Sequence, residues 1–470
     1  MQDKSTICAI STPAGVGGIA VIRVSGNDAL DICDKIIDPQ SAKGRLSEQQ
    51  ANTVCLRQVI APSLKGDKEE LDEVFVSVFH APHSFTGENV VEISCHGSVF
   101  IQQEIIKLLI TNGCQLAKPG EFTQRAFLNG KMDLSQAEAV ADLIASQSAA
   151  SHRLAMNQMR GGFSRELQHL RSQLLHFVSL IELELDFGEE EVEFADRNQL
   201  VRLADDIQVL IARLAHSFSL GNVLKNGVPV VIVGETNAGK STLLNLLLNE
   251  EKAIVSEIHG TTRDAIEDII NIQGISFRFI DTAGIRSPND EVEKIGIERT
   301  FQKIDQASII IWMIDTTHFN KEIESIADTI VPKTKHKKLI IVFNKIDKIS
   351  PEEQQILEEE FLPHVPAERI YLSAKYKKNT EKLEKALLKA ANLPELNAND
   401  VIVSNMRHYE ALTKALEAVE RVQNGLKTHL SSDFIAQDIR ECIHYLGEIT
   451  GAISVDEVLG NIFKNFCIGK

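Results

Sequence analysis

The 470-residue chain lacks any apolar run near the roughly 18 residues that a membrane-spanning helix needs. Its first residues, MQDKSTICAISTPAG, also lack the basic and then apolar segments of a secretory signal peptide. The 7 cysteines are scattered, without a C-x-x-C pair or the spacing of a disulfide framework. These absences favour a reducing compartment, and we expect a cytoplasmic protein that does not bind membranes.

Positive charge is in deficit as well. Lys and Arg number 49 against 66 Asp and Glu, which gives a formal net charge of −17. A protein that holds nucleic acid by bulk electrostatics should instead be basic over its binding surface. Any contact with RNA therefore requires a local basic patch or a basic partner.

Proline is missing from two long tracts, between Pro119 and Pro229 and after Pro394. Because proline breaks helix interiors, such tracts permit long helices. Apolar residues recur there at helical spacing over 134–144, 174–185 and 412–419. Between the tracts, short β-like runs alternate with helical stretches, which is typical of a parallel α/β sheet. We therefore predict an α/β domain inserted into a helical domain whose two sequence halves pack together.

The first 118 residues have a third character. Strand-like VIRVS, EVFVSVFHA and VVEISCHG accompany turn signals and one helical stretch, Ile101–Ile110, so we predict an α+β domain. The fold class is thus multidomain, with a discontinuous helical domain. The predicted boundaries are 1–118, 119–225 for the first helical half, 226–385 for the α/β domain and 386–470 for the second helical half.

A phosphate-binding loop follows the strand-like VPVVIV. Residues 234–241, GETNAGKS, match G-x-x-x-x-G-K-[ST] and precede the helical STLLNLLL. Backbone N–H groups of such a loop converge on phosphate oxygens. Lys240 should reach the β- and γ-phosphates, and Ser241 should ligate Mg²⁺.

Three further motifs follow in order. A Gly260–Asp264 segment, GTTRD, offers a threonine hydroxyl to Mg²⁺, and Asp281-Thr282-Ala283-Gly284 suits the magnesium water shell and the γ-phosphate. In Asn344-Lys345-Ile346-Asp347, Asp347 can accept both N1–H and N2–H₂ of guanine, for which adenine has no matching donors. Ser373-Ala374-Lys375 should cover the base. Motifs in this order at the ends of predicted strands indicate a Ras-like GTP-hydrolysing domain.

The catalytic group is less obvious. Many small GTPases place a glutamine after Asp-x-x-Gly to orient the attacking water, but Ile285 stands there. A downstream carboxylate in Asp290-Glu291-Val292-Glu293 could take that task. The other interpretation is a solvated acidic loop leading into a helix.

These residues resemble the tRNA-modification GTPase family MnmE, also called TrmE, among the TrmE–Era–EngA-like GTPases. The resemblance rests on Asn237 before Ala-Gly-Lys-Ser, the GTTRD switch, DTAGIR and DEVEKIGIER. It continues in SFTGE from Ser84, in PGEFTQRAFLNGK from Pro119 and in the terminal FCIGK. It therefore covers essentially the whole chain.

The resemblance implies a cation-assisted reaction. In the family, the GTPase domains dimerise when K⁺ binds, and this ion takes the place of an arginine finger. The implied K⁺ ligands are Asn237, Ser256, Ile258 and Thr261, and the implied water-orienting residue is Glu293. The motifs themselves give Ser241 and Thr262 as Mg²⁺ ligands and Lys240 as a catalytic residue. Cys467 is a candidate catalytic thiol because it lies among the last four residues, beside Lys470. The glutamate assignment favours the catalytic interpretation of the acidic loop. For Cys467, an ordinary structural role remains open, because its exposure and pKa are unknown from the sequence.

Motifs and resemblance together predict one GTP site, with GTP as the substrate. Its residues are Asn237, Ala238, Gly239, Lys240, Ser241, Thr242, Ser256, Glu257, Ile258, His259, Gly260, Thr261, Thr262, Asp281, Thr282, Ala283, Gly284, Asn344, Lys345, Asp347, Ser373, Ala374 and Lys375.

The resemblance also implies a folate site and partners. A 5,10-methylenetetrahydrofolate or 5-formyltetrahydrofolate-like donor would contact Arg23, Glu92, Lys131 and Lys470. The implied assembly is a homodimer that joins the flavoprotein MnmG in a heterotetramer, with FAD on the partner only. Together they would add a carboxymethylaminomethyl group to C5 of the wobble uridine of certain tRNAs. Two alternatives remain: a regulatory or ribosome-assembly GTPase without folate chemistry, and a membrane-remodelling GTPase.

Overall fold

The computed structural model describes residues 5–38, 44–62, 68–186, 197–235, 237–251, 267–280, 304–318, 321–335, 337–361, 364–394, 400–453, 459, 462–464, 466–467 and 469. The chain forms two compact units. The first contains Met1–Ile144, Gln158–Val209 and Ala411–Lys470, and the second contains Ala145–Asn157 and Leu210–Glu410. Each unit is therefore assembled from segments that are distant in the sequence.

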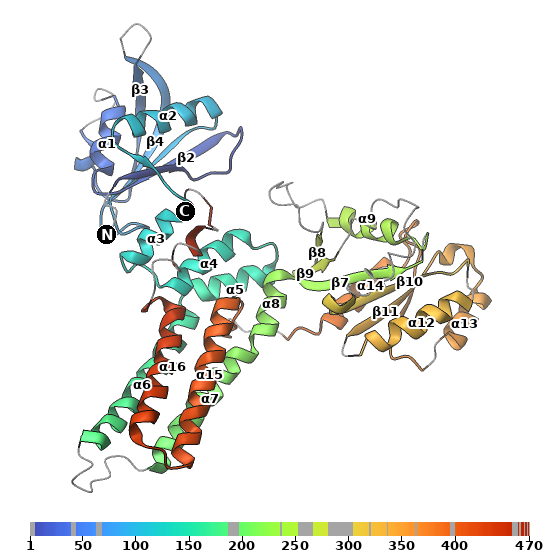
Figure 1. Ribbon diagram of the computed structural model, residues 1–470. Helices are drawn as coiled ribbons and strands as arrows, with labels where there is room; N and C mark the ends of the chain where they lie inside the picture. Colours follow the sequence, from blue (N-terminus) through green and yellow to red (C-terminus); the bar gives the residue numbers. More distant parts are fainter. Residues whose placement is uncertain are drawn as a thin grey trace. The chain divides into compact units, whose positions relative to one another are not determined.

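A six-stranded sheet begins the first unit, in the order β3-β4-β5-β2-β1-β6 (Figure 1). The strands are β1 (Ile7–Ile10), β2 (Ile19–Ser25), β3 (Thr53–Pro62), β4 (Lys68–Phe79), β5 (Val90–His96) and β6 (Gln115–Leu116). Only the β1–β6 pair is parallel. Helices α1 (Ala29–Ile36) and α2 (Val99–Thr111) and the short 3₁₀ helix η1 (Leu46–Glu48) accompany the sheet. The predicted α+β domain and its helix near 101–110 are confirmed.

The two faces of this sheet differ. Ala20, Ile22 and Val24 of β2 are buried in one core with side chains of α1 and α2. Successive side chains of a strand point to opposite faces, so Arg23 lies on the other face. There it stands across from Glu92 of β5 in the strand register.

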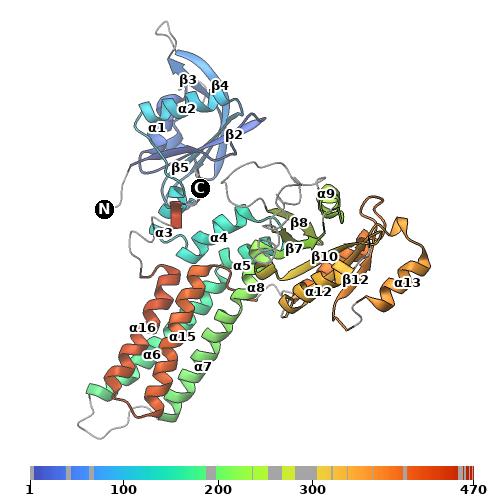
Figure 2. The ribbon, with the colours of Figure 1, turned by 45° about the vertical axis from the view of Figure 1, so that its right-hand side comes forward.

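Helices make up the rest of the first unit. They include α3 (Glu121–Leu128), α4 (Leu134–Ala145), α6 (Gly162–Asp186) and α16 (Ser432–Thr450), together with parts of α5 (Ala149–Met159), α7 (Arg197–His216) and α15 (Met406–Lys427). Helices α6 and α16 run along each other (Figures 1 and 2), and an ion pair joins Glu182 to Arg440. Gln423 also donates to Asp205 at 2.7 Å. The two sequence halves of the helical domain therefore pack together, as predicted.

The second unit is built on a sheet in the order β12-β11-β10-β7-β9-β8. Its strands are β7 (Val228–Gly234), β8 (Asp268–Ile272), β9 (Ile275–Phe279), β10 (Ile309–Asp315), β11 (Lys338–Asn344) and β12 (Glu368–Tyr371). All neighbours are parallel except the β8–β9 pair. This order and direction confirm the predicted Ras-like α/β domain. The antiparallel edge strand β8 is a feature that the sequence pattern did not indicate.

Both faces of the second sheet are covered. Val230 and Ile232 of β7 are buried in a core that includes residues of α9 (Lys240–Glu251) and α14 (Thr380–Ala391). Val231 and Val233 are buried in another core that includes residues of α12 (Lys321–Lys333). Other described helices of this unit include α8 (Phe218–Asn226), α13 (Pro351–Glu360), the short 3₁₀ helix η3 (Ile346–Lys348) and most of α5. Burial on both faces explains why the interiors of β7, β10 and β11 are continuous apolar runs.

One stretch of the described chain passes a length and composition test for a membrane span. It runs from Asn198 to Asn226, and buried helices of globular cores pass the same test.

A close backbone approach fixes α8 within the second unit. A Cβ atom on Gly221 would lie 2.0 Å from the carbonyl oxygen of Val403, so only glycine fits. We expect Gly221→Ala to destabilise this unit by about 1–3 kcal/mol, because overpacking outweighs the better helix propensity of alanine. Urea unfolding followed by circular dichroism measures the loss. As a control, Gly18→Ala should leave the unfolding midpoint unchanged, since no heavy atom lies within 4 Å of its added Cβ. Equal midpoints for the two variants would contradict the packing argument.

Candidate functional site

The parallel register of the second sheet brings the predicted nucleotide motifs to one edge. Strands β7, β10, β11 and β12 all run in the same direction. Gly234 ends β7 and Asn344 ends β11, and Ser373 follows β12 by two residues. Ligands of open α/β sheets bind at the carboxyl ends of the strands.

The phosphate loop needs glycine at two positions. Gly234 has φ 149° and Gly239 has φ 97°. Added Cβ atoms would lie 2.2 Å from the Met313 carbonyl oxygen and 2.3 Å from Nδ2 of Asn344, respectively. Asn237, at φ 64°, is exposed in the same loop. The loop is therefore held tightly against β10 and β11 as it enters α9.

Lys240 folds back over this loop. Its Nζ donates to the carbonyl oxygens of Gly234 at 2.6 Å and Glu235 at 2.7 Å. Burial lowers the pKa of the ammonium group, and the nearby Glu235 carboxylate opposes that shift. A cation fixed above a loop of N–H groups is the arrangement that suits phosphate oxygens.

Asn344 links three motifs through one buried amide. Its Nδ2 donates to the carbonyl oxygen of Ala238 at 2.8 Å, and its Oδ1 accepts from the N–H of Ala374 at 3.0 Å. The residue is only 3% exposed. The phosphate loop, the end of β11 and the loop after β12 are thus joined by side-chain hydrogen bonds. A role for Asn344 in positioning therefore accompanies its predicted place in the nucleotide site.

The predicted guanine-recognising aspartate is also held in place. Ser373 Oγ donates to Oδ1 of Asp347 at 2.5 Å. Lys345, at φ 68°, forms an ion pair with Asp315 at the end of β10. Burial opposes ionisation of Asp315, but hydrogen bonds from Lys345 and Thr317 outweigh it and hold the pKa of its carboxyl below the usual value. Sequence reasoning missed Asp315, although its place at the end of IIIWMID was an available signal.

Two of the predicted folate residues meet in the first unit. Arg23 and Glu92 form an ion pair at 2.8 Å. The guanidinium carbon of Arg23 lies 5.3 Å from the ring centre of Phe85 and 5.7 Å from that of Phe122. Arg23 also donates to the carbonyl oxygen of Gly469 at 3.4 Å. Gly469 is therefore brought to this pair, which no local sequence pattern indicated.

Lys131 and Cys467 lie in the same unit. Lys131 Nζ donates to the carbonyl oxygen of Pro82 at 2.9 Å, three residues before Phe85. Cys467 is exposed, and its carbonyl oxygen accepts from the N–H of Gly120 at 3.3 Å. The exposed thiol is accessible to reagents, while its catalytic role stays a prediction.

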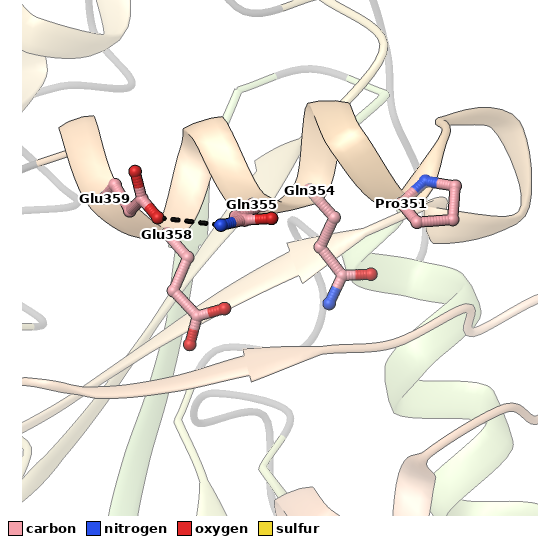
Figure 3. Close-up of a pocket in the computed structure, with 5 residues that line it drawn as sticks. All are labelled: Pro351, Gln354, Gln355, Glu358 and Glu359. Atoms are coloured by element: carbon pink, nitrogen blue, oxygen red, sulfur yellow. Dashed lines mark hydrogen bonds between the residues drawn. The ribbon is translucent and has the colours of Figure 1, made fainter.

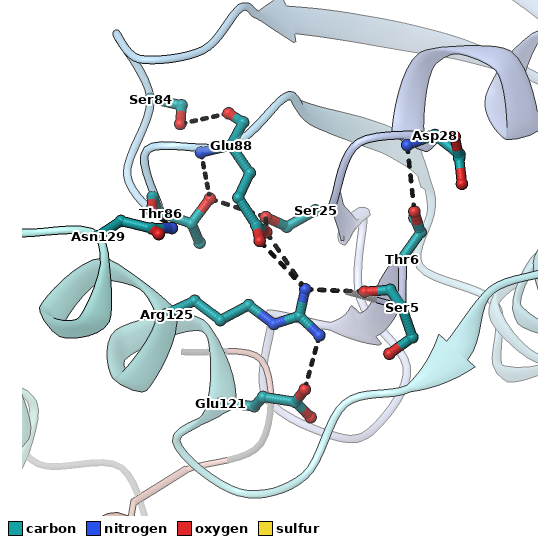
Figure 4. Close-up of polar contacts among 10 residues, drawn as sticks. All are labelled: Ser5, Thr6, Ser25, Asp28, Ser84, Thr86, Glu88, Glu121, Arg125 and Asn129. Atoms are coloured by element: carbon teal, nitrogen blue, oxygen red, sulfur yellow. Dashed lines mark hydrogen bonds and ion pairs between the residues drawn. The ribbon is translucent and has the colours of Figure 1, made fainter. Parts of the chain in front are cut away.

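A buried polar network ties this region to α3 (Figure 4). Arg125 is 6% exposed and donates to Glu121 at 2.8 Å, to Glu88 at 3.3 Å and to the Ser5 carbonyl oxygen at 2.8 Å. The hydroxyl of Ser25 donates to Glu88 at 2.7 Å and lies 2.7 Å from the hydroxyl of Thr86. The loop that carries Phe85 is therefore anchored at Thr86 and Glu88.

Several predicted site residues lie outside the described residues. They are Ser256, Glu257, Ile258, His259, Gly260, Thr261, Thr262, Asp281, Thr282, Ala283, Gly284, Glu293 and Lys470. The predicted Mg²⁺ ligand Ser241 and its neighbour Thr242 lie in the first turn of α9, directly after Lys240. Lys375 is exposed beside Ala374.

A shallow surface pocket lies along α13 (Figure 3). It is lined by Pro351, Gln354, Gln355, Glu358 and Glu359, none of them a predicted site residue. Its carboxylates would repel phosphate. The pocket therefore does not compete with the sheet edge as the nucleotide site.

The sheet order, the lysine-bearing loop before α9 and the Asn-Lys-x-Asp motif after β11 define a P-loop GTP-hydrolysing enzyme. Residues 134–467 match the MnmE helical domain family, and residues 6–131 match the family described as GTP-binding protein TrmE N-terminus. The chain belongs to the MnmE family of tRNA modification GTPases.

Full-length relatives agree with this assignment. The tRNA modification GTPase MnmE of Bacteroides thetaiotaomicron is 58% identical over 472 residues, with 100% of each chain covered. That of Christiangramia forsetii is 54% identical over 480 residues, again with 100% of each chain covered. A crystal structure of Era in complex with MgGDPNP and nucleotides of 16S ribosomal RNA is 34% identical. It covers 41% of this chain and 66% of Era, with a TM-score of 0.28.

The held carboxylate of Asp347 predicts a change of base preference. An asparagine there presents an N–H₂ group where guanine requires an acceptor, but that group can donate to the C2 carbonyl of xanthine. We expect Asp347→Asn to weaken GTP binding by about 10²-fold or more, since two charge-assisted hydrogen bonds are lost, and to favour XTP. Equilibrium binding of both nucleotides measures this. Asp328→Asn, on the exposed face of α12, serves as the control. An unchanged preference for GTP over XTP would refute the assignment.

Proposed function

We propose that this tRNA modification GTPase adds a carboxymethylaminomethyl group to C5 of the wobble uridine, U34, of certain tRNAs. It would act with the flavoprotein MnmG, which carries FAD, and with a tetrahydrofolate derivative as one-carbon donor. The observation that carries the folate part is the Arg23–Glu92 ion pair beside Phe85 and Gly469. Family membership supports the partner and the tRNA product.

The residues around Arg23 suit a pterin with an anionic tail. The Glu92 side chain is 26% exposed, so part of its carboxylate is accessible to the amino and N–H donors of a pterin. Phe85 offers an aromatic ring beside it. Lys131 and Lys470 would supply cations for the tail. When bound, the folate supplies the one-carbon unit, and this chain's side chains orient it.

GTP hydrolysis is proposed to depend on Mg²⁺ and K⁺. Ser241 at the start of α9 and Thr262 would hold Mg²⁺ through hydroxyl oxygens. Asn237 is exposed in the phosphate loop, and its amide oxygen is a neutral ligand suited to a hard monovalent cation. Ser256, Ile258 and Thr261 would complete the K⁺ shell. The cation would offset charge that develops on the phosphate oxygens, and Glu293 would orient the water.

The proposed assembly is a homodimer that joins MnmG in a heterotetramer in the cytoplasm. We assign folate binding and dimerisation to residues 1–118. Residues 226–385 would form the GTPase domain, between helical halves at 119–225 and 386–470. The K⁺ sites would act in GTP hydrolysis when the GTPase domains dimerise.

The cation proposal predicts a selective loss in Asn237→Ala. We expect turnover in K⁺ to fall to the level measured in Na⁺, because the side-chain ligand is gone, while GTP affinity stays within about 2-fold. Steady-state hydrolysis in each salt measures this, with Asn222→Ala on α8 as the control.

Glu293→Ala should lower turnover by about 10²-fold without preventing dimerisation. Equal turnover of the unmutated protein in K⁺ and Na⁺ would rule the mechanism out.

The folate proposal predicts separable losses in Glu92→Gln. Glutamine replaces one acceptor by a donor, so we expect folate binding to weaken by about 10-fold or more, with GTP hydrolysis unchanged. In a deletion strain, this variant should fail to restore cmnm⁵-type nucleosides, as measured by mass spectrometry of tRNA. The matched control is Glu104→Gln, which removes a partly exposed carboxylate of α2 in the same domain. Full restoration by Glu92→Gln would contradict the proposal, and the regulatory or ribosome-assembly alternative would gain.

A further inference from the structure

A concentration of lysines lies in the second unit of this acidic chain. Residues 371–391, which run from the end of β12 through α14, contain six lysines and two glutamates, a net charge of +4. The whole chain carries −17. The lysines fall into two groups, a turn at residues 373–378 and a row on α14.

The turn, here called the basic hairpin (residues 373–378), has a fixed backbone. Ser373 and Lys378 exchange two backbone hydrogen bonds, each of 3.1 Å. Lys377 at the tip has φ 53°, and Asn379 closes the turn by donating to the Tyr371 carbonyl oxygen at 2.9 Å. Its charged side chains therefore project from a rigid base.

An aromatic ring lies among these lysines. Tyr376 is 61% exposed, which is unusual for a side chain of its size, and Lys375 Nζ lies 5.2 Å from its ring centre. An exposed ring beside ammonium groups suits a nucleotide, because the ring can stack on a base while the cations meet phosphates.

The second group, here called the lysine row (Lys382, Lys385 and Lys389), continues along α14. All three are exposed, and their spacing places them on one face of the helix. Lys389 also pairs with Glu368 at 3.1 Å. Glu381 precedes Lys385 by one helical turn and borders the row, whereas Glu384 lies farther around the helix. The basic surface therefore extends from the hairpin along the helix.

We propose that Tyr376, Lys377 and Lys378 of the basic hairpin, together with the lysine row, form an RNA-binding surface of this chain, which contacts the tRNA backbone beside the guanine site. The proposal rests on the family's activity on tRNA, and it does not depend on folate, K⁺ or MnmG. RNA is favoured over an acidic protein because Tyr376 is presented with the cations. The surface adjoins the nucleotide edge, since Ser373 binds Asp347 and Ala374 binds Asn344.

The test compares two charge reversals of equal size in the full-length protein. Lys382→Glu/Lys385→Glu removes the centre of the surface. Lys335→Glu/Lys338→Glu is the control. These exposed lysines lie at or just before the start of β11, which is the end of the parallel strands away from Ser373. Binding of a tRNA transcript is measured by fluorescence anisotropy at several salt concentrations, without partner or folate.

We expect the α14 variant to weaken tRNA binding by about 10-fold or more. It should also reduce the slope of log K against log salt by about 1–2, as expected for two lost phosphate contacts. The control should stay within about 2-fold of the unmutated protein. Basal GTP hydrolysis, measured without RNA, should be unchanged in both and shows that each variant is folded.

Tyr376→Ala gives an independent readout. Loss of a stacking ring should weaken binding by about 5-fold or more at an unchanged salt slope, since no charge is removed. The proposal is overturned if the α14 variant binds tRNA within about 2-fold of the control. It is equally overturned if both charge reversals weaken binding alike, because the effect is then one of net charge. If the unmutated protein bound no folate or showed no stimulation by K⁺, the proposed function would be overturned. The result for the RNA-binding surface would still stand.

Discussion

The nucleotide edge of the second unit depends on one buried amide side chain. Asn344 ends β11 and holds Ala238 on one side and Ala374 on the other. An amide can do this because it carries a donor and an acceptor on the same planar group. Loss of this group would leave a backbone carbonyl and a backbone N–H unpaired in the interior, which costs about 1–3 kcal/mol for each. The phosphate loop and the base-side loop therefore keep their relative geometry through a single residue.

A buried cation has the corresponding role in the first unit. Arg125 of α3 meets two carboxylates and a backbone carbonyl, so its charge is compensated away from water. The contact with Glu88 ties α3 to the loop that presents Phe85 to Arg23. The sheet supplies Arg23 and Glu92, while Phe122 of α3 and Gly469 complete their surroundings. Residues from distant parts of the sequence thus form one site.

Much of the fold was predictable because the local patterns were strong. The apolar strands of the second sheet, the helices near 101–110 and 134–144 and the pairing of the two helical halves all follow from periodicity and proline placement. The antiparallel β8 was not predicted, because strand direction depends on partners rather than on the pattern of one segment. Asp315 was missed for a similar reason. A single aspartate at the end of an apolar strand is a signal without a motif around it, and its contact with Lys345 shows its role.

The sequence by itself determined the class of this protein. Phosphate and guanine chemistry require the glycines, Lys240 and the Asn-Lys-x-Asp motif at fixed spacing. These residues can therefore be recognised from the sequence alone. Only the tertiary structure decided which residues contact one another. It places Asn344 between two loops, Gly469 beside Arg23 and the lysine surface next to the guanine motif. These contacts join residues up to 458 positions apart, as between Ser11 and Gly469, and local spacing holds no information about them. Short motifs indicate the enzyme class, whereas the surroundings of each site depend on how distant segments pack together.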